Sequence, residues 1–311
     1  MGMVVMAGHG TFLKRLYHGF RLAPCVGAGT VLAVKATLAY TDVMSDATKQ
    51  HRPQPLAEFM AATIFLTRLP LRWKGDWPDD LNRRALSWFP IVGCLIGVAG
   101  GVLYWALTVA GLAPLLAAIV TVAALTWLTG ALHEDGLADV ADGFGGGRDK
   151  EAKLSIMKDS RVGTYGSMAL ILVVLARVGV LATLADPRTV ALALIGAHAF
   201  SRGLLPLVKL ALPDARLKGV SADQGRPDSA RALVALLIGF TLAATALNKL
   251  HLASGMISLS VMAISAAAVW GVARLSKKQI GGVTGDVLGA GQQMAEIGFL
   301  LALAAVIPAS T

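Results

Sequence analysis

Long apolar stretches separated by polar loops run through most of the chain. Seven of them can cross a bilayer as helices, since a crossing takes about 20 predominantly apolar residues. They cover residues 88–110, 112–132, 167–185, 189–212, 231–247, 252–273 and 291–309. In the first of them, Gly93, Gly97, Gly100 and Gly101 place three glycines near one helical stripe. Such a stripe favours close packing against another helix, although glycine is also simply common in membrane helices.

An eighth segment, residues 56–71, is shorter and carries Glu58 and Arg68. It crosses the membrane, re-enters or lies on the surface, and we favour a helix that enters the membrane. No stretch alternates with the two-residue period of a strand. The sequence therefore predicts an all-α fold, a polytopic transmembrane helical bundle of seven to eight spans.

The distribution of basic residues orients this bundle. Seven crossings put four loops on one face, and these loops carry fifteen Lys and Arg residues, whereas the opposite turns carry only Arg188 and Lys249. The four loops are residues 71–87, 133–166, 213–230 and 274–290. Cytoplasmic loops are enriched in Lys and Arg. We therefore expect an integral protein of the plasma (inner) membrane whose large loops, including the catalytic one, are cytoplasmic.

Composition agrees with a chain that lies in the lipid bilayer. Hydrophobic residues make up 55% and charged residues 15% of its 311 residues, against roughly 25% charged residues in ordinary globular domains. This excludes intrinsic disorder and a soluble nucleic-acid binder, so the net charge of +9 reports topology and no nucleic-acid partner is expected. Cys25 and Cys94 cannot form a disulfide framework. Residues 1–55 are predicted to be an N-terminal extension of uncertain role, and residues 56–311 the membrane domain.

An acidic run follows the second predicted span. Asp135, Asp139 and Asp142 stand at i, i+4 and i+7, within an arc of about 60° on one helix face. Such carboxylates repel one another unless a divalent cation lies between them, and oxygen ligands favour Mg²⁺ or Mn²⁺ over Zn²⁺. We add Glu134, about 100° away on the helix, as an outer metal-site residue or ion-pair partner. The alternative is a solvated acidic cap on a membrane helix.

A glycine-rich stretch, residues 143–147, and then a basic segment continue this loop. Lys158 and Arg161 can both bind phosphate, Arg161 in bidentate fashion. Ser160 and Gly163 add hydroxyl and backbone donors before the third span, where a helix N-terminus favours anions. Ordinary flanking charge is the alternative. Acidic and basic ligands in one loop together indicate phosphoryl or nucleotidyl transfer.

Two further clusters extend the predicted site. Arg202, four residues after His198 inside a span, is predicted to bind substrate because a charge at membrane depth is costly; a buried structural pair is the alternative. Thr284 and Asp286, in a glycine-rich stretch before the last span, supply a hydroxyl and an acid. Two more basic residues lie in spans: Arg177 is expected to form an ion pair with an unnamed partner, and Lys209 is expected to snorkel towards the membrane surface.

From about residue 59 to the C-terminus, the chain resembles the cobalamin synthase (adenosylcobinamide-GDP ribazoletransferase) family. The motifs that carry the resemblance are residues 65–70, 88–90, 133–147, 158–166, 201–202 and 281–289. The resemblance implies an Mg²⁺-dependent membrane enzyme that joins adenosylcobinamide-GDP to α-ribazole or its 5′-phosphate and releases GMP. Lys158 and Arg161 would neutralise the pyrophosphate, and Asp142 or Asp286 would accept a proton. Whether the protein is a homo-oligomer stays open.

Two alternative functions remain at this stage. The aspartate spacing is similar to that of CDP-alcohol phosphotransferases, but Phe144 and Gly145 replace the alanine–arginine pair that follows their aspartate–glycine pair. A membrane transporter is the second alternative, but it predicts acids and broken helices near the middle of the membrane. The acidic cluster here is predicted to lie in a loop.

Overall fold

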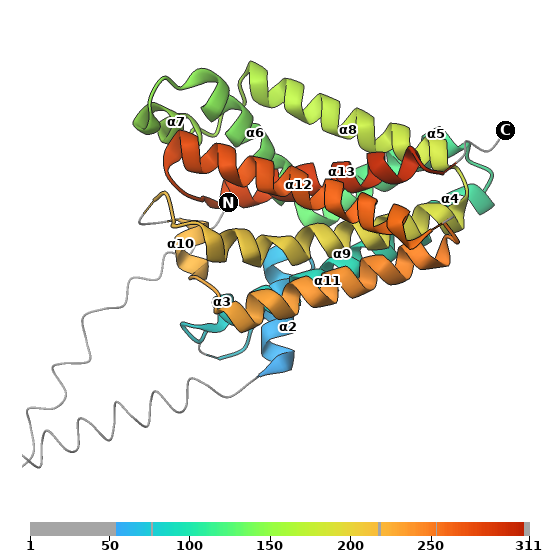
Figure 1. The fold of residues 1–311 in the computed structure, drawn as a ribbon, viewed down its shortest axis with the longest axis horizontal. Helices are drawn as coiled ribbons and strands as arrows, with labels where there is room; N and C mark the ends of the chain where they lie inside the picture. The colour runs from blue at the N-terminus through green and yellow to red at the C-terminus, as the bar shows by residue number, and fades with distance from the viewer. Residues whose placement is uncertain (1–53, 76, 217–218, 253, 308–311) are drawn as a thin grey trace, which may run out of the picture. The chain divides into compact units, whose positions relative to one another are not determined.

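The computed structural model describes residues 54–75, 77–216, 219–252 and 254–307. Apart from Gln54 and Pro55, the predicted N-terminal extension lies outside these residues. The described part is helical (Figure 1), and its one isolated β-bridge pairs Asp214 with Val283. The predicted all-α class is confirmed. The helices are α2 (Pro55–Leu66), α3 (Leu81–Ala85), η1 (Leu86–Trp88), α4 (Phe89–Val109), α5 (Pro114–Thr129), α6 (Leu132–Gly146), α7 (Lys150–Ile156), α8 (Thr164–Leu184), α9 (Pro187–Ala211), α10 (Val220–Gln224), α11 (Ser229–Lys249), α12 (Gly255–Ile280) and α13 (Gly285–Ala304).

Six of the seven predicted spans are continuous helices in the described chain. They are α4, with α3 and η1 leading into it, and α8, α9, α11, α12 and α13. The predicted span 112–132 is wrong as a single helix, because α5 ends at Thr129 and α6 continues at an angle of 89°. Gly130 (φ 66°) and Ala131 (φ 56°) adopt left-handed backbone conformations that end the first helix. Counted together as one broken span, the two helices bring the total to seven.

The eighth apolar segment forms only α2, a helix of 12 residues, or about 18 Å. This is too short for a hydrocarbon core of about 30 Å, and Figure 1 shows α2 lying across the long helices. Beyond its end, the Arg68 backbone N–H donates to the Leu128 carbonyl at 2.8 Å. The Arg68 side chain then lies directly over Gly130, where any Cβ would collide with it. The tip of this segment therefore packs against the break between α5 and α6.

Helix α9 lies at the centre of the bundle, and small residues let α4 approach it. A Cβ on Gly97 would lie 2.6 Å from the Leu194 carbonyl oxygen, and one on Gly101 would lie 2.6 Å from Ala191 Cβ. The predicted glycine stripe is thus a real helix contact. In α9 and α13, 78% of the spanning window is buried, whereas the corresponding fractions for α8, α11 and α12 are 33%, 33% and 28%. The latter three expose their apolar side chains at the periphery.

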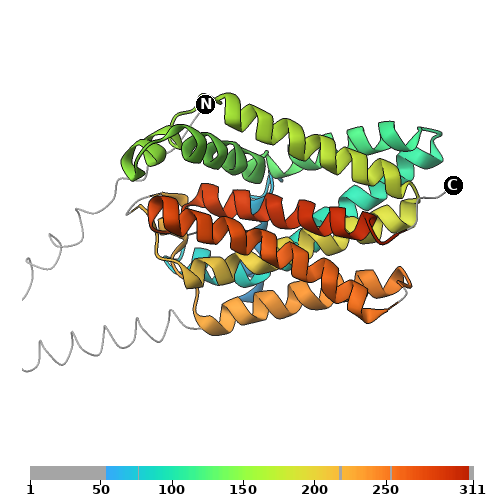
Figure 2. The same ribbon diagram turned by 45° about the horizontal axis from the view of Figure 1, so that its top comes forward.

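The alternating helices leave the predicted basic loops at one end of the bundle. In Figures 1 and 2, α7, α10 and the start of α13 lie at this end, while the connections from α4 to α5, from α8 to α9 and from α11 to α12 lie at the other. We call it the basic end. It holds the acidic helix α6 and the loop that follows, so chemistry and charge gather in the same place.

Candidate active site

The contact between α6 and α13 depends on two glycines. A Cβ on Gly136 would lie 2.7 Å from the carbonyl oxygen of Asp286, and a Cβ on Gly289 would lie 3.3 Å from His133 Cα. The first distance is too short for an alanine and the second would be a tight contact, so the close approach of the two backbones relies on the absence of these side chains. The approach places the acidic face of α6 beside the first turn of α13.

Three carboxylates interact electrostatically as a result. The carboxylate of Asp139 is repelled by those of Asp135 and Asp286, and it is attracted by the guanidinium of Arg216. Asp135 is exposed and Asp139 is half-buried. The structure therefore brings together three of the acids that the sequence analysis selected from segments about 150 residues apart.

A cavity of about 140 Å³ opens next to these acids. Its polar wall residues are His133, Asp135, Lys209, Gln224 and Asp286, and every other residue in its wall is apolar or glycine. Carboxylates thus stand on one side of the cavity and hydrophobic groups cover most of the rest.

Asp286 is held by two neighbours. The Thr284 hydroxyl donates to Asp286 Oδ2 at 3.2 Å, and it also accepts the Val287 backbone N–H that begins α13. Arg216 Nη1 lies 3.5 Å from the same carboxylate oxygen, and Arg216 Nη2 donates to the Leu154 carbonyl at 2.9 Å. Thr284 and Asp286, both predicted site residues, are therefore adjacent.

From the sequence, Arg216 was only one of the fifteen Lys and Arg residues used to orient the bundle. Its position depends on a pairing of two loops, in which the Ala215 N–H donates to the Val283 carbonyl and the Val283 N–H donates to the Pro213 carbonyl, each at 2.8 Å. This pairing joins residues about 70 positions apart, so sequence spacing carried no signal of it.

Asp142 faces away from the cavity wall and towards the start of α8. Its Oδ2 accepts the Gly163 N–H at 2.7 Å, and its Oδ1 accepts the Gly166 N–H at 2.9 Å. A Cβ on either glycine would collide with this carboxylate. A carboxylate at a helix N-terminus also meets the favourable end of the helix dipole. Asp142 therefore connects the acidic helix to the basic segment.

Glu134 is buried and pairs with Arg177, whose Nη1 lies 2.7 Å from Glu134 Oε1. The second guanidinium nitrogen, Nη2, lies 3.1 Å from Glu296 Oε1. These are the partners of Arg177 that the sequence analysis could not name. Of the two roles considered for Glu134, the structure shows the ion pair.

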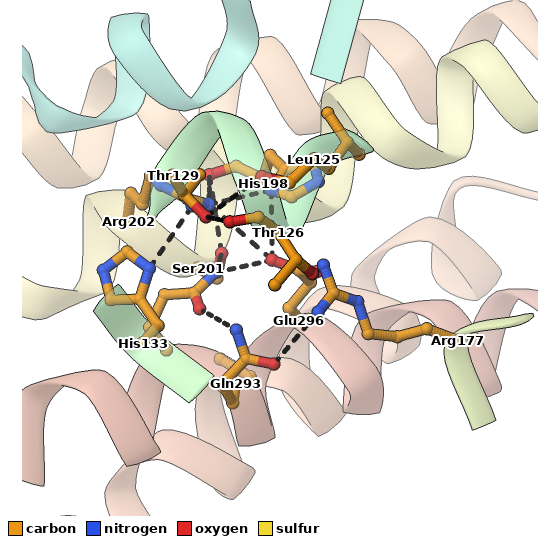
Figure 3. Close-up of polar contacts among 12 residues, drawn as sticks. Leu125, Thr126, Thr129, His133, Arg177, His198, Ser201, Arg202, Gln293 and Glu296 are labelled. Carbon is orange, nitrogen blue, oxygen red and sulfur yellow. Dashed lines mark hydrogen bonds and ion pairs between the residues drawn. The ribbon is translucent and has the colours of Figure 1, made fainter. Parts of the chain in front are cut away.

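Arg202 and His198 belong to the same buried network (Figure 3). His198 Nδ1 lies 3.0 Å from Glu296 Oε2 and 2.8 Å from Arg202 Nη1, while Arg202 Nη2 lies 3.4 Å from His133 Nδ1. Arg202 and Glu296 are each 1% exposed. Two arginines and two glutamates balance in charge here, which suits a low-dielectric interior. Arg202 is linked to the cavity through His133.

Lys209 corrects one prediction. It was expected to snorkel, but it is 1% exposed, and its Nζ lies 2.9 Å from Asp214 Oδ1 and donates to Ser221 Oγ at 2.7 Å. Burial raises the pKa of Asp214, but hydrogen bonds from Ser221 and Lys209 outweigh it and leave the pKa below its usual value. A paired, buried lysine in the cavity wall replaces the expected surface cation.

The basic segment lies outside the cavity wall. Lys158, Ser160, Arg161 and Gly163 are exposed, and the Arg161 guanidinium forks onto Asp159 with contacts of 3.0 and 2.6 Å. Hydrogen bonds from Arg161 lower the pKa of Asp159 to about 2. The exposed Arg161 guanidinium can release the Asp159 carboxylate and bind a phosphate instead, because the oxygens of the two groups have similar geometry.

The described residues contain no group of three or more His, Cys, Asp or Glu side chains that could hold a metal ion by themselves. Mg²⁺ does not need such a cage, because it commonly uses one or two carboxylates together with substrate phosphates and water. Asp135 and Asp139 fit this pattern. Asp142 fits it poorly, since both of its oxygens accept backbone hydrogen bonds.

Multiple membrane spans with acids, basic loops and a cavity at one end define a polytopic membrane enzyme. Residues 58–304 match the family of cobalamin-5-phosphate synthases. Relatives named adenosylcobinamide-GDP ribazoletransferase include one from Bradyrhizobium diazoefficiens, 42% identical over 250 residues (80% of this chain, 94% of the relative). Others come from Azorhizobium caulinodans, 43% identical over 254 residues (79% and 94%), and Ralstonia nicotianae, 37% identical over 242 residues (75% and 89%). No solved structure matches the chain.

The chain therefore belongs to the cobalamin-5-phosphate synthase family, and it is a multi-span membrane transferase of cobalamin biosynthesis. The family resemblance and the enzyme class predicted from the motifs are confirmed. The match also decides against the two alternatives, a CDP-alcohol phosphotransferase and a transporter.

Proposed function

We propose that this protein joins adenosylcobinamide-GDP to α-ribazole, or to its 5′-phosphate, and releases GMP. The product is adenosylcobalamin or its 5′-phosphate. The shared name of its relatives supports this substrate pair, and the alignments cover 94% of the first two of them. The structural observation that carries the proposal is the meeting of carboxylates from α6 and α13 beside a cavity, at the basic end of the bundle.

The chemistry is a displacement at phosphorus. A ribose hydroxyl oxygen of α-ribazole forms a bond to the phosphorus attached to cobinamide, the bond from that phosphorus to the bridging oxygen breaks, and GMP departs with that oxygen. The hydroxyl proton passes to a carboxylate. Asp286 suits this role because it lines the cavity and lies near Arg216, whereas Asp142 is engaged at the start of α8.

Asp135 and Asp139 are the proposed Mg²⁺ ligands: Asp135 lines the cavity with Asp286, and Asp139 follows one turn later on α6. The ion, when bound with the pyrophosphate, would supply stabilisation of the charge that develops on the phosphate oxygens. Glu134 supports this helix from within through Arg177. Asp142 contributes by holding the basic segment against α6.

The phosphate-binding groups are proposed to come from the exposed basic segment. Arg161 exchanges Asp159 for a phosphate, and Lys158 and Ser160 add a further charge and a hydroxyl donor. Gly163, whose N–H donates to Asp142, holds the segment against α6. Thr284 orients Asp286. Positioning and electrostatic stabilisation dominate phosphoryl transfer, and these are the roles proposed for these residues.

The basic end is proposed to face the cytoplasm. The excess of Lys and Arg in its loops supports this orientation. GMP and the nucleotide-activated substrate would then be exchanged with the cytoplasm.

The test is an assay of the full-length purified protein in lipid nanodiscs with adenosylcobinamide-GDP, α-ribazole and Mg²⁺. We expect GMP and the cobalamin to appear in equal amounts, and neither to appear when one substrate is omitted. The Asp286→Asn variant serves as the matched control for contaminating activity. GMP release without cobalamin would show a hydrolase and overturn the proposal.

A further inference from the structure

The cavity beside the acids has walls that phosphate chemistry does not use. Phe65 of α2 and Phe89 of α4 stack at 5.6 Å between ring centroids with an interplanar angle of 13°, and both line it. Leu86, Leu205 and Leu288 also line the cavity. An apolar cavity of about 150 Å³ holds a benzene-sized ring, and this one measures about 140 Å³, so it has room for one six-membered aromatic ring.

Two of the polar side chains in the wall, Lys209 and His133, have partners on the side away from the cavity. Lys209 pairs with Asp214 and Ser221, and His133 contacts Arg202. An ammonium has three N–H donors, so Lys209 keeps one donor beyond its two described partners. Outside the carboxylate side, the cavity therefore offers mostly apolar surface, with the remaining Lys209 donor and the amide of Gln224 as its polar groups.

We propose that this cavity binds the six-membered aromatic ring of the ribazole substrate's base, a dimethylated benzimidazole. The assignment rests on the proposed function. That base is a flat hydrocarbon-rich double ring with one unsubstituted ring nitrogen that accepts a hydrogen bond, which the remaining Lys209 donor can supply. Guanine, the base of the other substrate, carries donors and acceptors around its edge, and burying them unpaired against leucine and phenylalanine would be unfavourable.

The position of the acids agrees with this assignment. Asp135 and Asp286 line the same cavity, so a base inside it holds the attached ribose beside these carboxylates. Fixing a nucleophile next to its proton acceptor removes much of the entropic cost of the reaction. The cavity thus acts as a positioning site for the attacking hydroxyl as well as a specificity site for the base.

The first test narrows the cavity mouth without disturbing the core. Val220 lines the cavity and is 54% exposed, so Val220→Trp can be accommodated. We expect the Kd for α-ribazole, measured by equilibrium dialysis on the protein in nanodiscs, to rise about tenfold or more, since an apolar ring would lose burial. The Kd for adenosylcobinamide-GDP should stay unchanged. The control is Val234→Trp, at a 45% exposed position of α11 outside the cavity, and it should change neither Kd.

The second test enlarges the cavity. Phe65→Ala removes one ring of the stacked pair, so this variant should bind and turn over a naphthimidazole riboside that the unaltered protein rejects. Gain of a substrate cannot arise from misfolding. Failure to gain it, together with an unchanged Kd for α-ribazole in Val220→Trp, would overturn the assignment.

Two outcomes separate the cavity from the reaction. A rise in Kd only for adenosylcobinamide-GDP in Val220→Trp would assign the cavity to guanine and overturn our proposal. If the unaltered protein binds α-ribazole in the cavity but forms no cobalamin, the proposed function fails while the binding site stands. If the unaltered protein forms cobalamin but Val220→Trp leaves the Kd for α-ribazole unaffected, the binding site fails while the proposed function stands.

Discussion

Asp135 and Asp142 stand two turns apart on α6, yet their environments differ. Asp135 is exposed and lines the cavity, whereas Asp142 accepts two backbone hydrogen bonds at the start of α8. A shared helix face predicted a shared role for them. The neighbouring helices determine which residue has free lone pairs for a ligand.

Substitutions of these two aspartates should have different effects. Asp135→Asn should lower Mg²⁺-dependent turnover about 10²- to 10⁴-fold, because it removes a proposed charge at the phosphates, and leave thermal stability unchanged. Asp142→Ala should lower the free energy of unfolding by about 0.5–2 kcal/mol through loss of the helix cap. The measurements are GMP release and thermal unfolding in detergent. Stability loss in Asp135→Asn with normal turnover would contradict the metal role.

Arg161 provides a second prediction at the level of one residue. Its planar fork matches phosphate oxygens and an ammonium does not, so Arg161→Lys should not restore what Arg161→Ala loses. We expect kcat of Arg161→Ala to fall about 10²-fold or more, as for removal of a transition-state charge contact. Steady-state kinetics at saturating Mg²⁺ measure this. An unchanged kcat with a raised KM would limit Arg161 to ground-state binding.

Among the helices, the break between α5 and α6 organises the site. A continuous helix over residues 112–132 would carry His133 and Glu134 away from α13 and Arg177. Instead, the 89° change of direction at Gly130 and Ala131 sends α6 along α8 and α13. Hydropathy alone could not reveal this break, because the apolar run continues through Gly130 and Ala131 to Leu132, and this glycine resembles any other membrane glycine.

The break predicts an unusual sensitivity to one methyl group. Gly130→Ala should lower the free energy of unfolding by about 1–2 kcal/mol or more, since a left-handed alanine is strained and its Cβ would collide with Arg68. The control is Gly179→Ala in α8, where a Cβ meets nothing within 4 Å. It should be neutral or slightly stabilising. Thermal unfolding of both variants measures the difference. If Gly130→Ala and Gly179→Ala change stability equally, the conformation at the break is not specially sensitive.

For the whole molecule, the gathering of basic loops at one end allows a direct test of orientation. In a variant without Cys25 and Cys94, Glu151→Cys on α7 should resist a membrane-impermeant thiol reagent in intact cells and react in inverted vesicles. Ser254→Cys, at the opposite end of the bundle, should show the reverse pattern. Labelling of Glu151→Cys from outside would invert the proposed topology.

The amino-acid sequence by itself determined the helical membrane class, most of the spans, the loops that share one end and the family. Hydropathy, charge bias and motif chemistry are properties of contiguous residues, so they can be recognised without a structure. The roles of Asp142, Glu134, Lys209 and Arg216 emerged only in three dimensions. Each depends on a partner that lies elsewhere in the chain or on the direction a helix takes after a break. Packing between distant segments decides which charges meet and which of them face the cavity.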